Sequence, residues 1–159
     1  MSTVNVDVSD PKIFEPSSFR LAANGQKVLE IANELKLEPC KEPSENSMIN
    51  IELRIIDDGD EKGIKVFDRI IVWPEGAVLT EKQKIGREIN QQRLVHLTMA
   101  AGVKTKEELA ADGSIPLEQF KGRAVNAYVG TTTYKKQDTG EIVKKNEVKR
   151  YLFKKATTE

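Results

Sequence analysis

The chain has 159 residues, of which 38% are hydrophobic, so it is long enough to bury a core within one domain. It contains no run approaching twenty apolar residues and no charged leader before an apolar segment, which predicts a soluble cytoplasmic protein without a membrane span or a secretory signal. One cysteine and one histidine exclude an internal disulfide framework and a His/Cys zinc cluster, and we expect no metal or cofactor.

The charges are distributed unevenly, although the 25 basic and 25 acidic residues balance. Residues 1–63 carry seven basic and thirteen acidic residues, and residues 64–120 carry eight of each. Residues 121–159 carry ten basic and four acidic residues. This asymmetry indicates a basic face for a polyanion and an acidic region elsewhere.

Residues 1–24 predict an extended N-terminal arm, because prolines, serines and an Asn-Gly pair at its end come after a short alternating piece at Val4, Val6 and Val8. The alternating piece would form an edge strand that covers a sheet edge or pairs with a second copy. Residues 26–38 match both a helical stripe and a broken strand. The polar loop and the clear strand pattern after residue 38 favour the strand, because together they would make a hairpin.

This hairpin is predicted from composition and alternation. Residues 39–47 form a polar loop by composition, and residues 48–57 alternate four apolar side chains with polar ones, which is the clearest strand pattern in the chain. An acidic turn with two glycines comes next. It lacks the spacing of a calcium loop, so a solvated turn is the preferred interpretation.

Residues 64–73 alternate with a period of two. One side is apolar except for Asp68, for which two explanations stay open: a buried partner such as Arg54, or a break in the strand. The other side interleaves cations with aromatic rings, and it consists of Lys65, Phe67, Arg69, Ile71 and Trp73. Cations suit phosphates and flat rings suit bases, so this side has the chemistry that a single-stranded nucleic acid requires.

Two helices are predicted next. Capping-box spacing predicts that a long helix begins after Thr80 and a shorter one after Thr105, and Gly102 suits the end of the first. His96 lies inside the long helix without a nearby acid or nucleophile, which favours a packing or surface role over catalysis.

The C-terminal third returns to strands, at residues 122–134 and 147–155. Between them, a turn at Asp138 and Gly140 is flanked by two pairs of lysines. In the last strand, alternation places Lys149, Tyr151 and Phe153 on one side.

The predicted order is three strands, a helix and two strands. This is the order of an OB-fold, a mainly β fold with five strands in a partly open barrel and a helix between strands 3 and 4, which binds oligonucleotides across strands 2 and 3 and the adjoining loops. We expect residues 25–155 to form this domain, residues 1–24 the arm and residues 156–159 a flexible C-terminus. Residues 64–73 would be strand 3.

The chain also resembles a family of small phage and prophage proteins that are often regarded as OB-fold single-stranded-DNA-binding proteins. The matching motifs are G-I-K-V-F-D-R-I-I-V-W (63–73), A-A-G (100–102), P-L-E-Q-F-K-G-R-A-V (116–125) and T-G-E…N-E-V-K-R-Y (139–151). The resemblance covers roughly residues 24–153. The chain departs from it in lacking a G-x-Y opening before the first strand and an acidic C-terminal tail.

The resemblance implies a sequence-independent single-stranded-DNA-binding protein, not an enzyme, that acts in phage DNA replication or recombination in the host cytoplasm. Its phosphate contacts would be Lys65, Arg69, Lys135, Lys136, Lys144, Lys145 and Lys149. Its stacking platforms would be Phe67, Trp73, Tyr128, Tyr134 and Tyr151. We expect a homodimer and contacts with replication or recombination proteins.

Other interpretations of these residues stay open. Phe67, Phe153 and Trp73 would also suit the ends of a barrel, and the lysine pairs would suit a solvated hairpin. An adaptor that docks on another protein with its open edge or N-terminal arm is the main alternative. An exposed helix face, or a basic face with its aromatic residues buried, would favour it. A metal-dependent nuclease, using some of Asp57, Asp58, Asp60, Asp68 and Glu75, is a remote one. Nothing in the sequence separates DNA from RNA.

Overall fold

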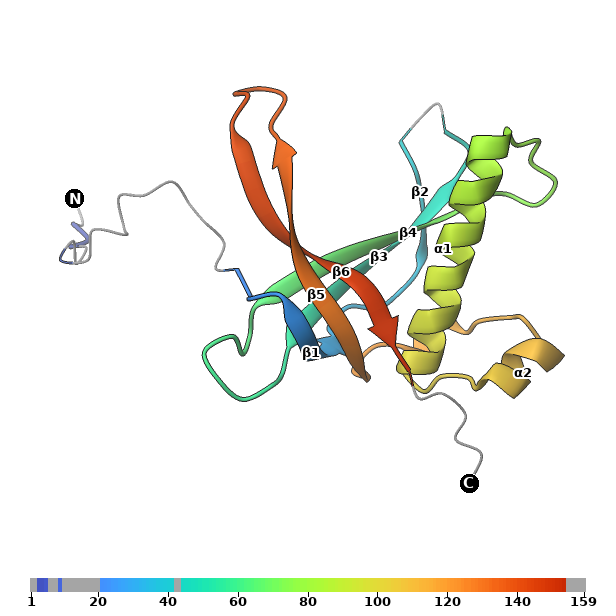
Figure 1. Cartoon of the computed structure of the whole chain (residues 1–159), viewed down its shortest axis with the longest axis horizontal. Helices are drawn as coiled ribbons and strands as arrows, with labels where there is room; N and C mark the ends of the chain where they lie inside the picture. Colours follow the sequence, from blue (N-terminus) through green and yellow to red (C-terminus); the bar gives the residue numbers. More distant parts are fainter. Residues whose placement is uncertain (1–2, 6–8, 10–20, 42–43, 154–159) are drawn as a thin grey trace.

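The structure is a computed structural model that describes residues 3–5, 9, 21–41 and 44–153 (Figure 1). Strands dominate it. They are β1 (Gly25–Ile31), β2 (Leu37–Pro39), β3 (Ser47–Ile55), β4 (Lys65–Val72), β5 (Ala124–Lys135) and β6 (Ile142–Leu152). The helices are α1 (Glu81–Ala100), α2 (Lys106–Ala111) and the short 3-10 helix η2 (Leu117–Gln119).

The six strands form one antiparallel sheet in the order β2-β3-β1-β5-β6, with β4 on the other side of β3. β3 pairs with β1 near its C-terminal end and with β2 at its N-terminal end. Between β1 and β2, the Asn33 side chain takes the place of a strand. Its amide donates to the Asn50 carbonyl at 2.9 Å and accepts from the Glu52 backbone at 2.9 Å. These bonds satisfy the edge of β3 where the strand ladder is interrupted.

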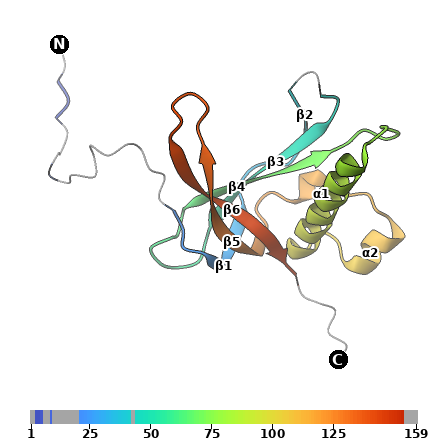
Figure 2. The ribbon, with the colours of Figure 1, turned by 45° about the horizontal axis from the view of Figure 1, so that its top comes forward.

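The sheet is not closed, because β4 and β6 share no ladder of backbone hydrogen bonds in the described pairings. The two strands nevertheless lie in contact, and α1 packs against both of them. Figure 2 shows α1 beside this side of the sheet, with the β5–β6 hairpin projecting away from it. Neither α1 nor α2, within the part of the chain that the structure describes, has the length and apolar character that crossing a membrane would require.

The inward side chains of the strands make the core. They alternate along β3 and β5 as the sequence predicts, and Leu29 and Ile31 of β1 are fully buried beside them. Phe120 and Leu97 close the core from the segment before β5 and from α1, and both are 0% exposed. Burying each of these large side chains contributes about 1.5–3 kcal/mol, so the core is the main source of stability.

Asp68 explains how β4 and β6 stay together without a backbone ladder. Its carboxylate accepts hydrogen bonds from Arg93 of α1 and from the Tyr151 hydroxyl of β6, each at 2.6 Å. Arg93 also donates to the Val148 carbonyl of β6 at 3.3 Å. One inward-facing acid thus connects three elements, and its side chain is only 11% exposed.

Of the two explanations considered for Asp68, a buried partner is confirmed and a break in the strand is wrong. The partly buried partner is Arg93 and not Arg54, because Arg54 extends toward Glu30 at 3.3 Å instead. The strand is not broken, since β4 runs continuously from Lys65 to Val72.

The described residues form six strands, whereas the sequence predicted five. The additional one, β2, has three residues and ends in a proline, so it carries no alternation that the sequence could reveal. The ambiguous residues 26–38 contain β1, which confirms the strand interpretation. Both capping boxes are confirmed at Thr80 and Thr105, and Gly102 comes directly after the α1 C-cap with φ at +70°.

Residues 21–24 join the folded unit, although the predicted domain begins at Gly25. Ala22 is 2% exposed, and its backbone N–H donates to Asn146 of β6 at 2.8 Å. Asn146 in turn donates to the Ala22 carbonyl at 3.0 Å. Most of the predicted arm (1–2, 6–8 and 10–20) and the predicted C-terminal tail lie outside the described residues.

Replacing Asp68 with alanine should lower the free energy of unfolding by about 2–4 kcal/mol, because it leaves Arg93 and Tyr151 without their shared acceptor. Urea unfolding followed by circular dichroism measures this difference. Asp60→Ala is the matched control, since Asp60 is exposed and its loss should change stability by less than about 0.5 kcal/mol. Equal effects of the two substitutions would show that Asp68 does not join β4 to β6.

Candidate functional site

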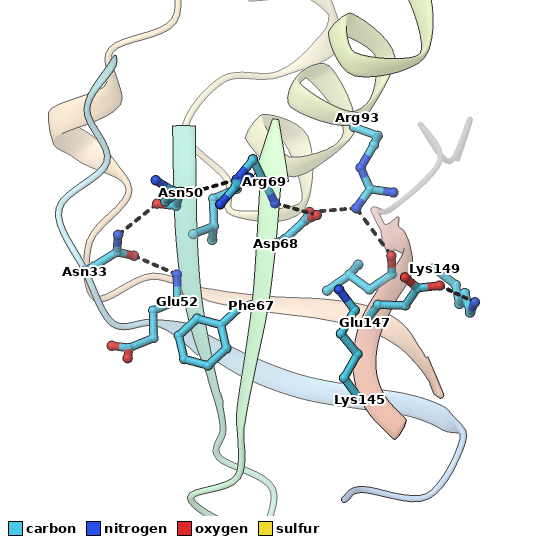
Figure 3. Close-up of a pocket in the computed structure, with 12 residues that line it drawn as sticks. Asn33, Asn50, Glu52, Phe67, Asp68, Arg69, Arg93, Lys145, Glu147 and Lys149 are labelled. Atoms are coloured by element: carbon cyan, nitrogen blue, oxygen red, sulfur yellow. Dashed lines mark hydrogen bonds and ion pairs between the residues drawn. The ribbon is translucent and has the colours of Figure 1, made fainter. Parts of the chain in front are cut away.

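An open groove with a volume of about 910 Å³ runs between the outer faces of β3 and β4 and the facing side of β6 (Figure 3). Two residues outside the strands also reach it: Asn33 after β1 and Arg93 of α1. The lining residues are Asn33, Asn50, Ile51, Glu52, Phe67, Asp68, Arg69, Arg93, Lys145, Glu147, Val148 and Lys149.

Phe67 is the most unusual side chain in the groove, because it is a large apolar ring that is 62% exposed. The alternation of β4 turns it outward together with Lys65 and Arg69, while Val66 and Ile70 face the core. Figure 3 shows Phe67 on the β4 side of the groove and Lys145 on the β6 side. An exposed ring of this size is available to a flat ligand.

Arg69 is held in place by a short chain of side chains. Its Nε donates to Asn50 Oδ1 at 3.0 Å, and Asn50 Nδ2 donates to Glu38 at 2.9 Å. This arrangement fixes the guanidinium through Nε and leaves its other nitrogens for an acceptor in the groove. Among the described residues, no ion pair joins Arg69 to a carboxylate.

The groove also contains three acids, and each is paired with a cation. Glu52 pairs with Lys65 at 3.3 Å, Asp68 with Arg93, and Glu147 with Lys149. Lys145 forms no ion pair with the described residues, and its Nζ lies 5.4 Å from the centre of the Tyr134 ring. Arg69 and Lys145 are therefore the groove cations with the most freedom to bind an anion.

The predicted binding residues fall into separate places. Four line the groove: Phe67, Arg69, Lys145 and Lys149. Four more lie near the tip of the β5–β6 hairpin: Tyr134, Lys135, Lys136 and Lys144. Lys65 shares the outer face of β4 but does not line the groove. The groove and the hairpin are adjacent, since Lys145 belongs to both.

Tyr128 lies on a different surface. It is 37% exposed on the outer face of β5, where the Arg150 guanidinium sits 5.3 Å from its ring centre. Its cross-strand neighbours are Gln26 and Arg150, and it does not line the groove.

Trp73 packs against α1 instead of facing the groove. A methyl group added to Gly86 of α1 would lie 3.6 Å from its ring, which shows how closely the two approach. The fluorescence of this residue, the only tryptophan, therefore reports on the contact between the end of β4 and α1, not directly on the groove.

Tyr151 was predicted to be a stacking platform, and its position is incompatible with that role because it is 3% exposed. The reason is a β-bulge. Tyr128 pairs with Arg150 while the next residue, Val129, pairs with Val148, so Lys149 is an extra residue in β6. The bulge reverses the alternation and turns Val148 and Tyr151 inward together.

Gly130 of β5 gives Lys149 its place beside the bulge. A Cβ atom at Gly130 would come within 2.6 Å of Lys149 Cε and 3.0 Å of its Cγ. Because Gly130 has no side chain, the aliphatic part of Lys149 packs directly over the backbone of β5.

Sequence reasoning missed Asn33, Asn50 and Arg93 as groove residues. The polar face of β3 indicated that Asn50 points outward, but nothing marked Asn33 or Arg93, which reach the groove through the tertiary packing of a loop and a helix. The acids considered for a nuclease do not gather either. Within the described residues, no three His, Cys, Asp or Glu side chains come together as metal ligands.

A comparison with protein-family models found no match for this chain, and a search of curated proteins found none either. The family resemblance therefore rests on the four sequence motifs at residues 63–73, 100–102, 116–125 and 139–151.

Burial raises the pKa of the Tyr151 hydroxyl well above its ordinary value of 10.0, and the adjacent Asp68 carboxylate raises it further. The protonated form thus stabilises the fold at neutral pH, and this contribution is lost as the pH rises above about 10, because the unfolded chain then releases the proton more readily.

Tyr151→Phe should lower the free energy of unfolding by about 1–3 kcal/mol at pH 7.5, and this deficit should shrink as the pH rises above 10. Urea unfolding of both proteins at several pH values measures it. A deficit that stays constant from pH 8 to pH 11 would contradict the assigned hydrogen bond.

Proposed function

We propose that the chain is a sequence-independent single-stranded-DNA-binding protein and that the groove between β3–β4 and β6 holds the strand. The observation that carries the proposal is the exposed Phe67 ring, placed between Arg69 on its own strand and Lys145 across the groove. A base that stacks on an aromatic ring contributes about 1–3 kcal/mol, and neighbouring cations bind the phosphates on either side of it.

The pairing order of the strands supports an OB-fold. Without β2, the strands pair in the order β4-β3-β1-β5-β6, and α1 lies between β4 and β5 in the chain. Five strands with a helix between the third and fourth, in a barrel that is only partly closed, are the features of that fold. In this mapping β3 and β4 are strands 2 and 3, and the β5–β6 hairpin is the loop between strands 4 and 5. The groove then lies where OB-folds bind oligonucleotides.

A single strand suits the groove better than a duplex. Phe67 offers a ring face, and the bases of a duplex hide their own faces in the stack, whereas an unpaired base exposes them. The amides of Asn33 and Asn50, which line the groove, already hydrogen-bond within the protein. Since every base has a flat face, the proposal predicts little dependence on sequence.

The near balance of charge in the groove predicts moderate affinity. Three of its acids already hold cations, so few unpaired cations are ready for phosphates. The lysines of the β5–β6 hairpin add further cations beside the groove. We propose that the groove and the hairpin bind DNA together, and that this binding serves phage DNA replication or recombination. Assembly into a homodimer, also proposed, would double the number of grooves.

An adaptor that docks on another protein is the second candidate. It is favoured by apolar side chains that α1 and the preceding loop leave in solvent: Ile85 is 59%, Ile89 52% and Val78 98% exposed. Ile85 and Ile89 are one turn apart on α1, so they share a face. This surface is separate from Phe67, so substitutions can test the two candidates independently.

Phe67→Ala should weaken the binding of a labelled oligo-dT of about eight nucleotides by roughly five- to 150-fold, the equivalent of the stacking contribution. Fluorescence anisotropy at low salt measures the dissociation constant, and the affinity of the unsubstituted protein should fall as salt is raised.

Ile85→Ala is the matched control, because Ile85 is as exposed as Phe67 but lies on α1, outside the groove. It should leave the dissociation constant unchanged within about twofold. Absence of binding at low salt would contradict the proposed function, and an equal loss in both variants would contradict the proposed site.

A further inference from the structure

A second, smaller groove lies between α1 and β6. Its volume is about 250 Å³, and we call it the α1–β6 groove. Its lining residues are Ile89, Gln92, Arg93, His96, Lys149, Arg150 and Tyr151. Three of these are cations and none is a carboxylate, whereas the main groove has three acids among its lining residues.

The two grooves share two lining residues. Arg93 and Lys149 line both of them. Moving along β6, the cations succeed one another from Lys145 in the main groove, through Lys149, to Arg150 in the α1–β6 groove. The bulge at Lys149 produces this succession, since it turns Lys149 and Arg150 outward as neighbours.

Arg150 is the cation of the α1–β6 groove that is most available to an anion. Arg93 and Lys149 already contact Asp68 and Glu147, but Arg150 forms no ion pair with the described residues. Its guanidinium is supported by the Tyr128 ring at 5.3 Å, which limits the conformational freedom that binding would otherwise remove.

We infer that a single strand leaving the main groove continues over Arg93 and Lys149 into the α1–β6 groove, where its phosphate backbone meets Arg150 and Gln92. This inference rests on the proposed function and extends it with a second phosphate subsite. The small volume suits a backbone phosphate and its sugar better than a stacked base. The His96–Phe153 ring pair, with centroids 4.9 Å apart, borders this path at the end of β6.

Nucleic acid fits this groove better than an acidic peptide does, because the groove shares two cations, Arg93 and Lys149, with the groove that contains Phe67. A strand that already occupies the main groove reaches Arg150 without a separate binding event. The second contact is then intramolecular, and it should be visible as a gain in affinity with oligonucleotide length.

Gln92→Glu tests the inference, since it places a carboxylate in the α1–β6 groove at an exposed helical position without changing the shape of the side chain. Gln91→Glu is the matched control, because it adds the same charge to the adjacent exposed position, outside both grooves. Fluorescence anisotropy is measured with oligo-dT of about eight and about twenty nucleotides.

We expect Gln92→Glu to weaken binding of the longer oligonucleotide about fivefold relative to Gln91→Glu and to leave the shorter one unchanged. Equal affinities of the two variants for the longer oligonucleotide would overturn the inference, and that is also the result expected if the groove serves an acidic peptide. In that case the proposed function stands if Phe67→Ala still weakens both oligonucleotides. Absence of binding by the unsubstituted protein would overturn both.

Discussion

The hydrogen-bonded cluster of Asp68, Arg93 and Tyr151 is the interaction on which the arrangement of the sheet depends. Backbone pairing holds β4 to β3 and β6 to β5, but none of the described pairings joins β4 to β6. Asp68 supplies the link, with both of its donors at 2.6 Å. A buried acid is costly unless it is fully paired, so the position of α1, which brings Arg93, is coupled to the closeness of the two strands.

This coupling also shapes the candidate site. β4 bounds the groove on one side and β6 on the other. The cluster joins these two strands, so it sets the distance between the walls of the groove. Arg93 serves the fold by bonding Asp68 and the Val148 carbonyl, and it also lines both grooves. A residue that supports the strands is thereby placed where it borders the proposed path of the nucleic acid.

Electrostatic attraction over the whole molecule cannot account for the proposed binding, because the chain has no net charge. Binding must depend on where individual cations stand and on which of them are unpaired. Arg69, Lys145 and Arg150 meet that condition among the residues described, and each is held by a neutral neighbour: Asn50, Tyr134 or Tyr128. Such support orients a cation without neutralising it.

Local pattern predicted much of this structure. The alternation of β3, β4 and β5, the two capping boxes and the outward position of Phe67 were all accessible to it, because each depends on residues close in sequence. The three-residue β2, the partners of Asp68 and the inward turn of Tyr151 were not. The first two depend on tertiary contacts. The third depends on the single extra residue Lys149, which changes which side chains of β6 point inward although the amino-acid pattern gives no sign of it.

The same limit applies to the site. Four of the twelve predicted binding residues line the groove, because strand alternation identifies an outward face but not the element that faces it. Tyr128 has the chemistry of a stacking residue and lies on another surface, and Trp73 packs on α1. Which aromatic residues share a groove is decided by strand order, and a single sequence does not contain that order explicitly.

Stacking of a base on Phe67, in the groove between β3–β4 and β6, is the contact on which the proposed function depends. Ultraviolet cross-linking of the protein to oligo-dT, with mass spectrometry of the digested complex, tests it most directly because it identifies the residue in contact with a base. We expect a cross-link at Phe67 that an excess of unlabelled oligo-dT abolishes. Cross-links confined to Tyr128 or to α1 residues such as Ile85, with none at Phe67, would contradict it.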